Sequence, residues 1–387
     1  MNRHHWVAGL AAALLASTAC AGIPDAAKLD AEVARAMAAT QAKGMAVAVI
    51  DDGRVVYARS AGTRNQQGDP LEPDTIMYGA SLTKATFAWF VMQLVDEGKL
   101  DLDAPISKYL TKPLPDYPDP DENYANWPDL AGDDRWKRLT PRILLTHSSG
   151  FANFGFLEPD GKLRFHFEPG SRYAYSGDGF VLLQFVIETG LGLDVGAEMQ
   201  RRIFDRFGMT RTSMTWRDDF AGNLADGWSR EGKVEPHDER SRVRAAGSMD
   251  TTLADMSKFV AAYVRGDGLS KSSHQQLFKA HLAITTASQF PTLQPELPGE
   301  RQITGLAAGL GVVSFSGPQG PGFQKGGHND STGNTWVCVQ RSKRCVLILS
   351  NDVRSEAAFP RLVKFAIGET GMPWAWEYGD LTFWGPR

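Results

Sequence analysis

The sequence has few cysteines and no cluster of positive charge. It contains three cysteines among 387 residues, and 41 Lys and Arg against 45 Asp and Glu give a formal net charge of −4. Because neither Lys nor Arg gathers along any helix-length stretch, the electrostatic surface that nucleic-acid binding requires is not indicated, and we exclude that class. With 42% hydrophobic residues, the chain is long and apolar enough for one large globular domain or two lobes.

Several catalytic and membrane signatures are also missing. The eight histidines form no H-x-x-x-H or other metal-binding spacing, so we expect neither a metal nor an organic cofactor. No G-x-S-x-G occurs, which argues against the nucleophile elbow of the α/β-hydrolases. The apolar run from Trp6 to Ala16 is too short to span a bilayer comfortably, so we expect no transmembrane segment in the mature chain.

The N-terminus is typical of a secretory signal. The stretch MNRHHWVAGLAAALLASTACAG has one arginine, a short apolar run and small residues ending in Ala19-Cys20-Ala21, so we interpret residues 1–21 as a signal peptide. We expect export to the periplasm or the medium of a bacterium. A lipid anchor at Cys20 is the less favoured alternative, because Ser17 occupies a position where lipoprotein signals usually carry an aliphatic residue.

The other two cysteines lie in two β-branched runs. Within TWVCVQRSKRCVLIL the runs meet at a polar turn around Arg341-Ser342, and counting outward from that turn places Cys338 opposite Cys345. A cross-strand disulfide fits an oxidising compartment. The alternative is a pair of ordinary buried thiols, since the geometry of such a bridge is demanding.

Hydrophobic patterns predict strands at both ends of the chain and helices between them. Residues 44–62 indicate a hairpin around Asp51-Asp52-Gly53, and apolar positions from Phe87 onward indicate a buried helix that Gly98 ends. Residues 112–138, rich in proline and acidic side chains, indicate an exposed loop. The remaining patterns predict mainly helices at 142–265, strands at 306–351 and a helix at 356–370.

This order predicts an α/β fold built from two lobes. An antiparallel sheet flanked by helices would come from about 22–80 and 266–387, and a mainly helical lobe from about 81–265 would be inserted between them. A cleft between the lobes is where we expect a site.

Ser81 and Lys84, in YGASLTKATFAWF, are the first candidates for chemistry. Serine is a weak nucleophile until a base removes its proton, and residues three apart at a helix start share a face. Burial and the positive end of the helix dipole disfavour the charged form of the amine, which makes lysine a base. Alone, however, one S-x-x-K in a chain of this length is expected by chance, and it favours a helix-start serine with a solvated lysine over a catalytic pair.

Two further elements favour the catalytic interpretation. FEPGSRYAYSGDGF places Tyr175 in a turn-rich segment, and FQKGGHNDSTGN places Lys325-Gly326-Gly327 at the end of a strand. Together with VAVIDDGRVVYARSAG, LTPRILLTHSSGF and VLILSND, in this order from about residue 44, the sequence resembles the serine hydrolases related to class C β-lactamases, DD-peptidases and the esterases of that fold. The resemblance implies a β-lactamase/DD-peptidase-like fold.

The same resemblance implies roles for individual residues. Ser81 would be the acylated nucleophile, Lys84 its proton partner, and Tyr175 a phenolate or proton relay whose pKa the neighbouring lysines lower. Lys325 matches the start of the third motif, and Gly326 and Gly327 would let the strand approach the substrate. The N–H groups of Ser81 and His328 would hold the oxyanion.

The sequence departs from the family pattern after Tyr175. Where relatives usually have Tyr-Ser-Asn, this chain has Tyr175-Ser176-Gly177, which removes an amide and argues against efficient β-lactam turnover. Asp178 is a candidate site residue that follows at once, with a simple turn residue as the alternative. His147 we interpret as structural and Arg354 as a surface residue rather than a carboxylate-binding one.

The sequence therefore predicts a hydrolase that forms an acyl-enzyme on Ser81 and cleaves a small ester, amide or lactam, with a small molecule or peptide as its substrate. A protein of the same fold that binds such ligands in the cell wall without turning them over is the alternative. Turnover, in which Ser81 is first acylated and then deacylated, would distinguish the hydrolase from the binding protein.

Overall fold

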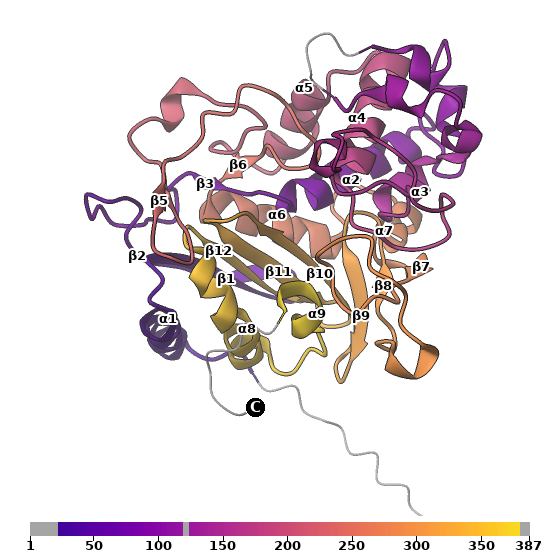
Figure 1. The fold of residues 1–387 in the computed structure, drawn as a ribbon. Coiled ribbons are helices and arrows are strands. Elements are labelled where there is room, and N and C mark those ends of the chain that lie inside the picture. Colours follow the sequence, from indigo (N-terminus) through magenta and orange to yellow (C-terminus); the bar gives the residue numbers. More distant parts are fainter. Residues whose placement is uncertain (1–21, 119–123, 380–387) are drawn as a thin grey trace, which may run out of the picture.

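An eight-stranded antiparallel sheet forms the centre of the protein (Figure 1). The computed structural model describes residues 22–118 and 124–379. In spatial order the strands are β2 (Arg54–Gly62), β1 (Gly44–Asp51), β12 (Arg344–Ser350), β11 (Gly333–Val339), β10 (Gly320–His328), β9 (Val313–Gly317), β8 (Ala307–Ala308) and β7 (Leu282–Ala283). The N-terminal hairpin thus pairs with the last strand of the chain, as in the register Met45 to Ser350.

Strand β1 is buried on both faces. Its side chains alternate between the two faces of the sheet, so they belong to two separate apolar clusters. Ala46, Ala48 and Ile50 belong to the larger apolar cluster, while Met45, Val47 and Val49 belong to a second cluster. Helix α6 (Leu253–Arg265) packs against β1, β2 and β12 on the first side. Helices α1 (Ala26–Thr40) and α8 (Phe359–Ile367) cover the second side.

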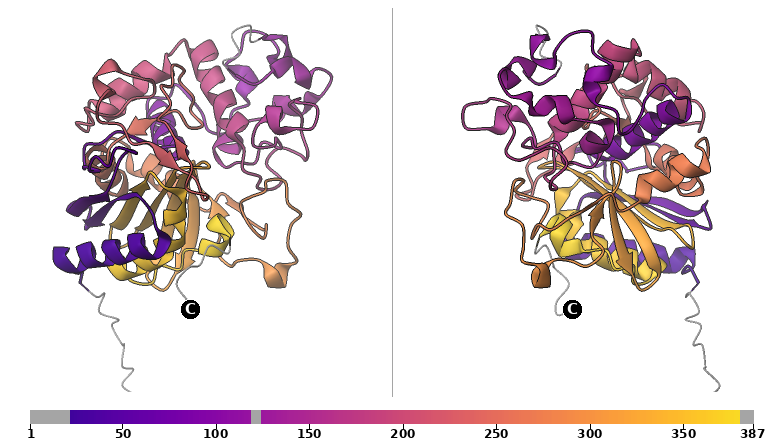
Figure 2. Two further views of the ribbon diagram at one scale, coloured as in Figure 1. Left: turned by 60° about the vertical axis from the view of Figure 1, so that its left-hand side comes forward. Right: turned by 90° about the vertical axis from the view of Figure 1, so that its right-hand side faces the viewer.

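The other helices gather at one end of the sheet. They are α2 (Leu82–Asp96), α3 (Pro141–Leu145), α4 (Gly177–Leu191) and α5 (Val195–Met199), with α7 (Lys271–Phe278) beside α2. The turned views place α2 to α5 at the opposite end of the molecule from α1 and α8 (Figure 2). Residues 82–94 of α2 are buried on every side, so α2 is the central helix of this region and contacts β10 and β11.

The predicted fold class is confirmed, and so are the hairpin of residues 44–62, the helix entered at Ser81 and the C-terminal strands. The hairpin turn has left-handed residues Asp52 and Gly53, with φ of +47° and +70°, as the Asp-Gly signal predicts. Helices α1 and α7 are not among the predicted elements. The mainly helical prediction for 142–265 is wrong between α5 and α6, where loops and the short strands β4 (Gly227–Trp228), β5 (Val234–Glu235) and β6 (Asp250–Thr251) prevail.

The exposed loop expected at 112–138 is wrong for most of its described part. Short 3-10 helices there bury the side chains of Leu114, Trp127, Leu130 and Trp136 in the main apolar cluster. Proline and acidic residues suggested solvent exposure, but the large apolar residues between them are spaced so that each 3-10 helix directs one or two of them inward.

The sequence pattern places the predicted end of the helical lobe near residue 265, after α6. In the structure α6 packs against the sheet, so it does not belong with the other helices of that lobe. The predicted signal peptide and Cys20 lie outside the described residues. Within residues 22–118 and 124–379, no single helix has the length and apolar character needed to cross a membrane, although the bent pair α4 and 195–204 passes on those two criteria alone.

The two cysteines of the C-terminal strands are joined in a disulfide. Cys338 on β11 lies opposite Cys345 on β12, with Cα atoms 4.1 Å apart. Both side chains are buried in the main apolar cluster, under Trp336. The bridge therefore fastens the hairpin that follows β10, the strand that carries Lys325.

Candidate active site

Ser81 lies where the chain passes from the short strand β3 (Met77–Tyr78) into α2. It is the N-cap residue of α2, and the preceding Ala80 has a φ of +47°, which non-glycine residues rarely adopt. Lys84 is one turn into the helix on the same face, and its Nζ lies 3.0 Å from Oγ of Ser81. Nζ also donates to the carbonyl oxygen of Ala246 at 2.6 Å. The two residues are therefore a coupled pair.

Tyr175 completes a triangle with this pair. Its hydroxyl donates to Oγ of Ser81 at 2.8 Å, and Nζ of Lys84 lies 4.8 Å from the centre of its ring. The ring stacks on His147, with centroids 4.2 Å apart and planes 23° apart. Nδ1 of His147 accepts from the N–H of Ser176 at 3.1 Å, so this histidine positions Tyr175 and does not contact Ser81.

Burial sets the protonation of these groups. It lowers the pKa of Lys84 well below its usual value, and the charge of Lys325 lowers that pKa further. Burial also raises the pKa of Tyr175, against the smaller effect of its bond to Ser81. The expected lowering of the tyrosine pKa by the lysines is thus wrong, because burial of the phenol, with the charge of Glu377, raises that pKa. The shift of Lys84 therefore favours the neutral amine, which is able to accept a proton, and the shift of Tyr175 favours the protonated phenol.

Strand β10 brings its backbone against the start of α2. A Cβ atom at Gly327 would lie 3.1 Å from the backbone nitrogen of Ser81 and 2.8 Å from the carbonyl oxygen of Gly79, so only glycine allows this approach. The side chain of Lys325 points toward Tyr175, with Nζ 5.2 Å from the ring centre. A Cβ at Gly326 would overlap the carboxylate of Glu377. The two glycines therefore make room for α2 and for Glu377, which is a different reason from the predicted contact with substrate.

The N–H of Ser81 has no acceptor within the described part of the chain, and the adjacent β10 carries His328 into the cavity lining. The assignment of these two N–H groups as oxyanion donors stays a prediction. The imidazole of His328 makes a contact of its own, because its Nδ1 lies 2.8 Å from Oε1 of Glu356. Burial is the largest single effect and alone would lower the pKa of His328, but the bond to Glu356 and the charges of Glu356 and Glu377 together raise it.

Glu377 is a site residue that the sequence did not reveal. It lies on the short helix α9 (Trp374–Tyr378), is 4% exposed, lines the cavity and accepts from Nε2 of Gln324 at 2.7 Å. Burial lowers the pKa of Lys325 to about 8, and the charge of Glu377 opposes that effect. No sequence motif marks Glu377, because it reaches the site only through the packing of α9 against β10.

A cavity of about 610 Å³ opens over Ser81. Its lining includes Lys84, Tyr175 and Lys325, the rings of Phe154, Phe156 and Phe290, and the loop 238–244. The described residues of the 112–138 segment do not line it.

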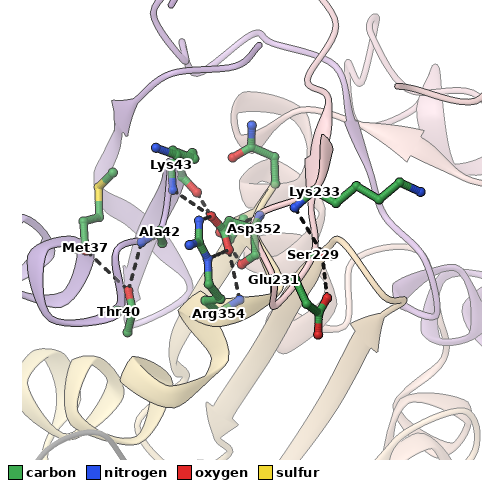
Figure 3. A network of polar contacts seen from close by, with 12 residues as sticks. Met37, Thr40, Ala42, Lys43, Ser229, Glu231, Lys233, Asp352 and Arg354 are labelled. Carbon is green, nitrogen blue, oxygen red and sulfur yellow. Dashed lines mark hydrogen bonds and ion pairs between the residues drawn. The ribbon is translucent and has the colours of Figure 1, made fainter. Parts of the chain in front are cut away.

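Two residues considered from the sequence lie away from the cavity. Asp178 is buried, and its Oδ2 accepts from the N–H of Gly155 at 2.6 Å instead of reaching Ser81. Burial raises the pKa of Asp178 to about 7. Arg354 folds back onto Asp352, whose carboxylate also accepts from the N–H of Lys43 at 3.0 Å (Figure 3). Arg354 is therefore a structural residue here.

A serine at the start of a buried helix, with a lysine one turn on and a tyrosine from the turn before α4, is the arrangement of an S-x-x-K protein on an α/β fold. The chain belongs to the Beta-lactamase family, whose family model matches residues 29–366. This covers the hairpin, α2, Tyr175 and the C-terminal strands β7 to β12.

Relatives extend over different parts of the chain. The D-alanyl-D-alanine-carboxypeptidase/endopeptidase AmpH of Escherichia coli is 25% identical over 73% of this chain and 72% of its own length. Esterase EstB of Burkholderia gladioli is 32% identical over 36% of this chain and 32% of its own length. The chain spans less than two thirds of several curated relatives that it matches.

Solved structures agree with the fold. The octameric penicillin-binding protein homologue from Pyrococcus abyssi superimposes with a TM-score of 0.70 and 22% identity, over 90% of this chain and 79% of that one. At this identity the similarity shows the β-lactamase/DD-peptidase-like fold.

The effect of Lys325 on Lys84 predicts a shift in pH dependence. Below the pKa of Lys84 its amine is protonated and does not accept the proton of Ser81, so acylation falls on the acid side. Because the charge of Lys325 holds the pKa of Lys84 down, Lys325→Met should move this acid limb to higher pH. The measurement is the second-order rate of Ser81 labelling by a fluorophosphonate from about pH 4 to pH 10. Lys325→Arg, which keeps the charge, should leave the limb in place, and an unmoved limb in the methionine variant would refute the coupling.

Proposed function

We propose that the protein is a serine hydrolase that forms an acyl-enzyme on Ser81 and cleaves small esters. The observation that carries this proposal is the triangle in which Oγ of Ser81 lies 3.0 Å from Nζ of Lys84 and 2.8 Å from the hydroxyl of Tyr175. Membership of the Beta-lactamase family and the names of AmpH and EstB support a hydrolase.

We propose a role for each group. The neutral amine of Lys84 takes the hydroxyl proton of Ser81 as Oγ attacks the ester carbonyl, while its N–H bond to Ala246 keeps the lone pair aimed at Oγ. The negative carbonyl oxygen is held by the N–H groups of Ser81 and His328. When the bond to the alcohol breaks, the proton passes from Lys84 through the Tyr175 hydroxyl to the leaving oxygen.

Deacylation uses the same groups in reverse. Loss of the proton leaves the amine of Lys84 neutral again, and it removes a proton from an incoming water that attacks the acyl carbonyl. Breakage of the bond to Oγ returns that proton to Ser81 and releases the acid. Tyr175 is a neutral phenol before acylation and again after deacylation, in agreement with its raised pKa.

Esters are favoured over lactams by the surroundings of residue 177. Gly177 has no side-chain amide, and the ring of Phe154 forms the adjacent wall of the cavity. An amide or lactam substrate would there lose a hydrogen-bonding partner when it leaves water, whereas an ester has no N–H to satisfy. D-amino-acid peptides, suggested by the name of AmpH, are the competing substrate class.

Hydrolysis assays with purified protein test the proposal. We expect p-nitrophenyl butyrate to be cleaved, with Ser81→Ala lowering kcat/KM by a factor on the order of 10³ or more, and nitrocefin to be cleaved much more slowly. Ser272→Ala, an exposed serine on α7, is the matched control and should behave as wild type. Activity that survives in Ser81→Ala would end the proposal.

The same assay separates an enzyme from a binder. Mass spectrometry after brief exposure to the ester should show a transient adduct on Ser81. A permanent adduct, or none, would indicate a protein that binds such ligands without turning them over.

We also propose that the protein is exported, on the N-terminal signal pattern and the disulfide between Cys338 and Cys345, which suits an oxidising compartment. Expression in a bacterium should release a mature chain cleaved after Ala21 into the periplasm or the medium. Intact-mass analysis of fractionated cells checks this. Mature protein that carries a diacylglycerol on Cys20 would point to a lipoprotein, and full-length protein in the cytoplasm would contradict export.

A further inference from the structure

The segment that follows the buried Phe151 is fastened to the start of α4. The N–H of Gly177 donates to the backbone oxygen and to Oδ1 of Asn153, at 2.8 and 3.0 Å. The N–H of Asp178 donates to the same backbone oxygen at 3.0 Å, and the carboxylate of Asp178 accepts from Gly155. Phe154, between these anchors, is therefore held at a fixed place next to the Tyr175 segment.

Gly177 and Phe154 fit together as a pair. A Cβ atom at residue 177 would overlap the outer edge of the Phe154 ring. Gly177 has no left-handed φ that would require glycine, so the need for glycine comes from this close approach. The ring thus occupies the space into which any side chain at residue 177 would project.

A second ring extends the surface outward. Phe156 stacks on Phe154 with centroids 5.2 Å apart and planes 12° apart, and both rings line the cavity above Ser81. Phe156 is 72% exposed, the highest exposure among the large apolar residues that the structure describes. A large exposed aromatic surface beside a catalytic serine is informative, because water contact with it is unfavourable until something apolar covers it.

We propose that Phe154 and Phe156 form an aromatic shelf that selects substrates carrying an apolar ring or a branched alkyl group. The inference rests on the proposed esterase function and adds the substrate class. The flat faces of two parallel rings favour an offset-stacked third ring or a broad alkyl surface, and they offer an anionic group no partner. The shelf is rigid at Phe154, through the anchors to α4, and open at Phe156.

Two series of esters test the shelf, one varying the acyl group and one varying the alcohol. In each series a methyl-sized group is compared with a phenyl-bearing and a branched alkyl group. We expect Phe156→Ala to lower kcat/KM for the bulky apolar members of one series by roughly tenfold and to change the smallest ester by less than about threefold. Leu157→Ala is the control, since Leu157 is 62% exposed next to Phe156 but does not line the cavity. It should leave the preference unchanged.

Residue 177 gives an independent second test. Gly177→Ala should displace the Phe154 ring, weaken the preference as Phe156→Ala does, and lower the melting temperature. The double variant Phe154→Ala, Gly177→Ala removes the overlap, so its melting temperature should match that of Phe154→Ala alone while the preference stays lost. A Gly177→Ala protein with full stability and full preference would show that the ring does not fill this space.

The outcomes separate this inference from the proposed function. If wild type cleaves esters through Ser81 but Phe156→Ala and Gly177→Ala reduce all esters equally, or none, the shelf is refuted and the esterase proposal stands. If ester cleavage is absent or independent of Ser81, the proposed function itself fails. The series in which the variants lose activity toward the bulky esters shows whether the acyl group or the alcohol group lies on the shelf.

Discussion

The burial of one amine determines what this site is able to do. Lys84 is 1% exposed, and its Nζ is enclosed by Ser81, the carbonyl of Ala246 and the ring of Tyr175. A charged ammonium in such a place has lost its water without gaining a carboxylate, and Lys325 adds repulsion. Each unit by which the pKa falls corresponds to about 1.4 kcal/mol of preference for the neutral form. The fold thus favours the neutral, basic form of a residue that is ordinarily a charged acid.

That burial is a product of the whole fold. Ser81 and Lys84 enter on α2, which is buried on every side, while Tyr175 comes from the turn before α4 and Ala246 from the loop before β6. The sheet contributes β10, whose two glycines let the strand lie against the start of α2 and under Glu377. Glu377 keeps a negative charge close to Lys325, and it belongs to a helix that is formed near the end of the chain. Lys325, more than 200 residues after Lys84 in the chain, therefore lowers the pKa of that amine, and Glu377 in turn acts on Lys325.

The sequence permitted prediction of the parts whose signals are local. The Asp-Gly turn, the apolar spacing after Phe87 and the two β-branched runs around Arg341 each depend on neighbours in the chain, and each prediction is confirmed. Ser81, Lys84, Tyr175 and Lys325 were found by motif, and the structure brings them together. Glu377, Ala246 and the Gly177–Phe154 contact have no local signal, because each depends on which distant segment packs beside it. The tyrosine pKa was predicted in the wrong direction because burial is not visible in a sequence.

The protonation state of Lys84 is the central claim, and NMR measures it directly. With lysine labelled at the side-chain Cε and Nζ, the Lys84 signal is identified by its loss in Lys84→Met, and its shift is followed as the pH is raised. We predict a signal with the shift of a neutral amine at neutral pH and a titration far below that of the surface lysines. Titration of Lys84 together with the surface lysines, near their usual pKa of about 10.4, would contradict this explanation of how Ser81 is activated.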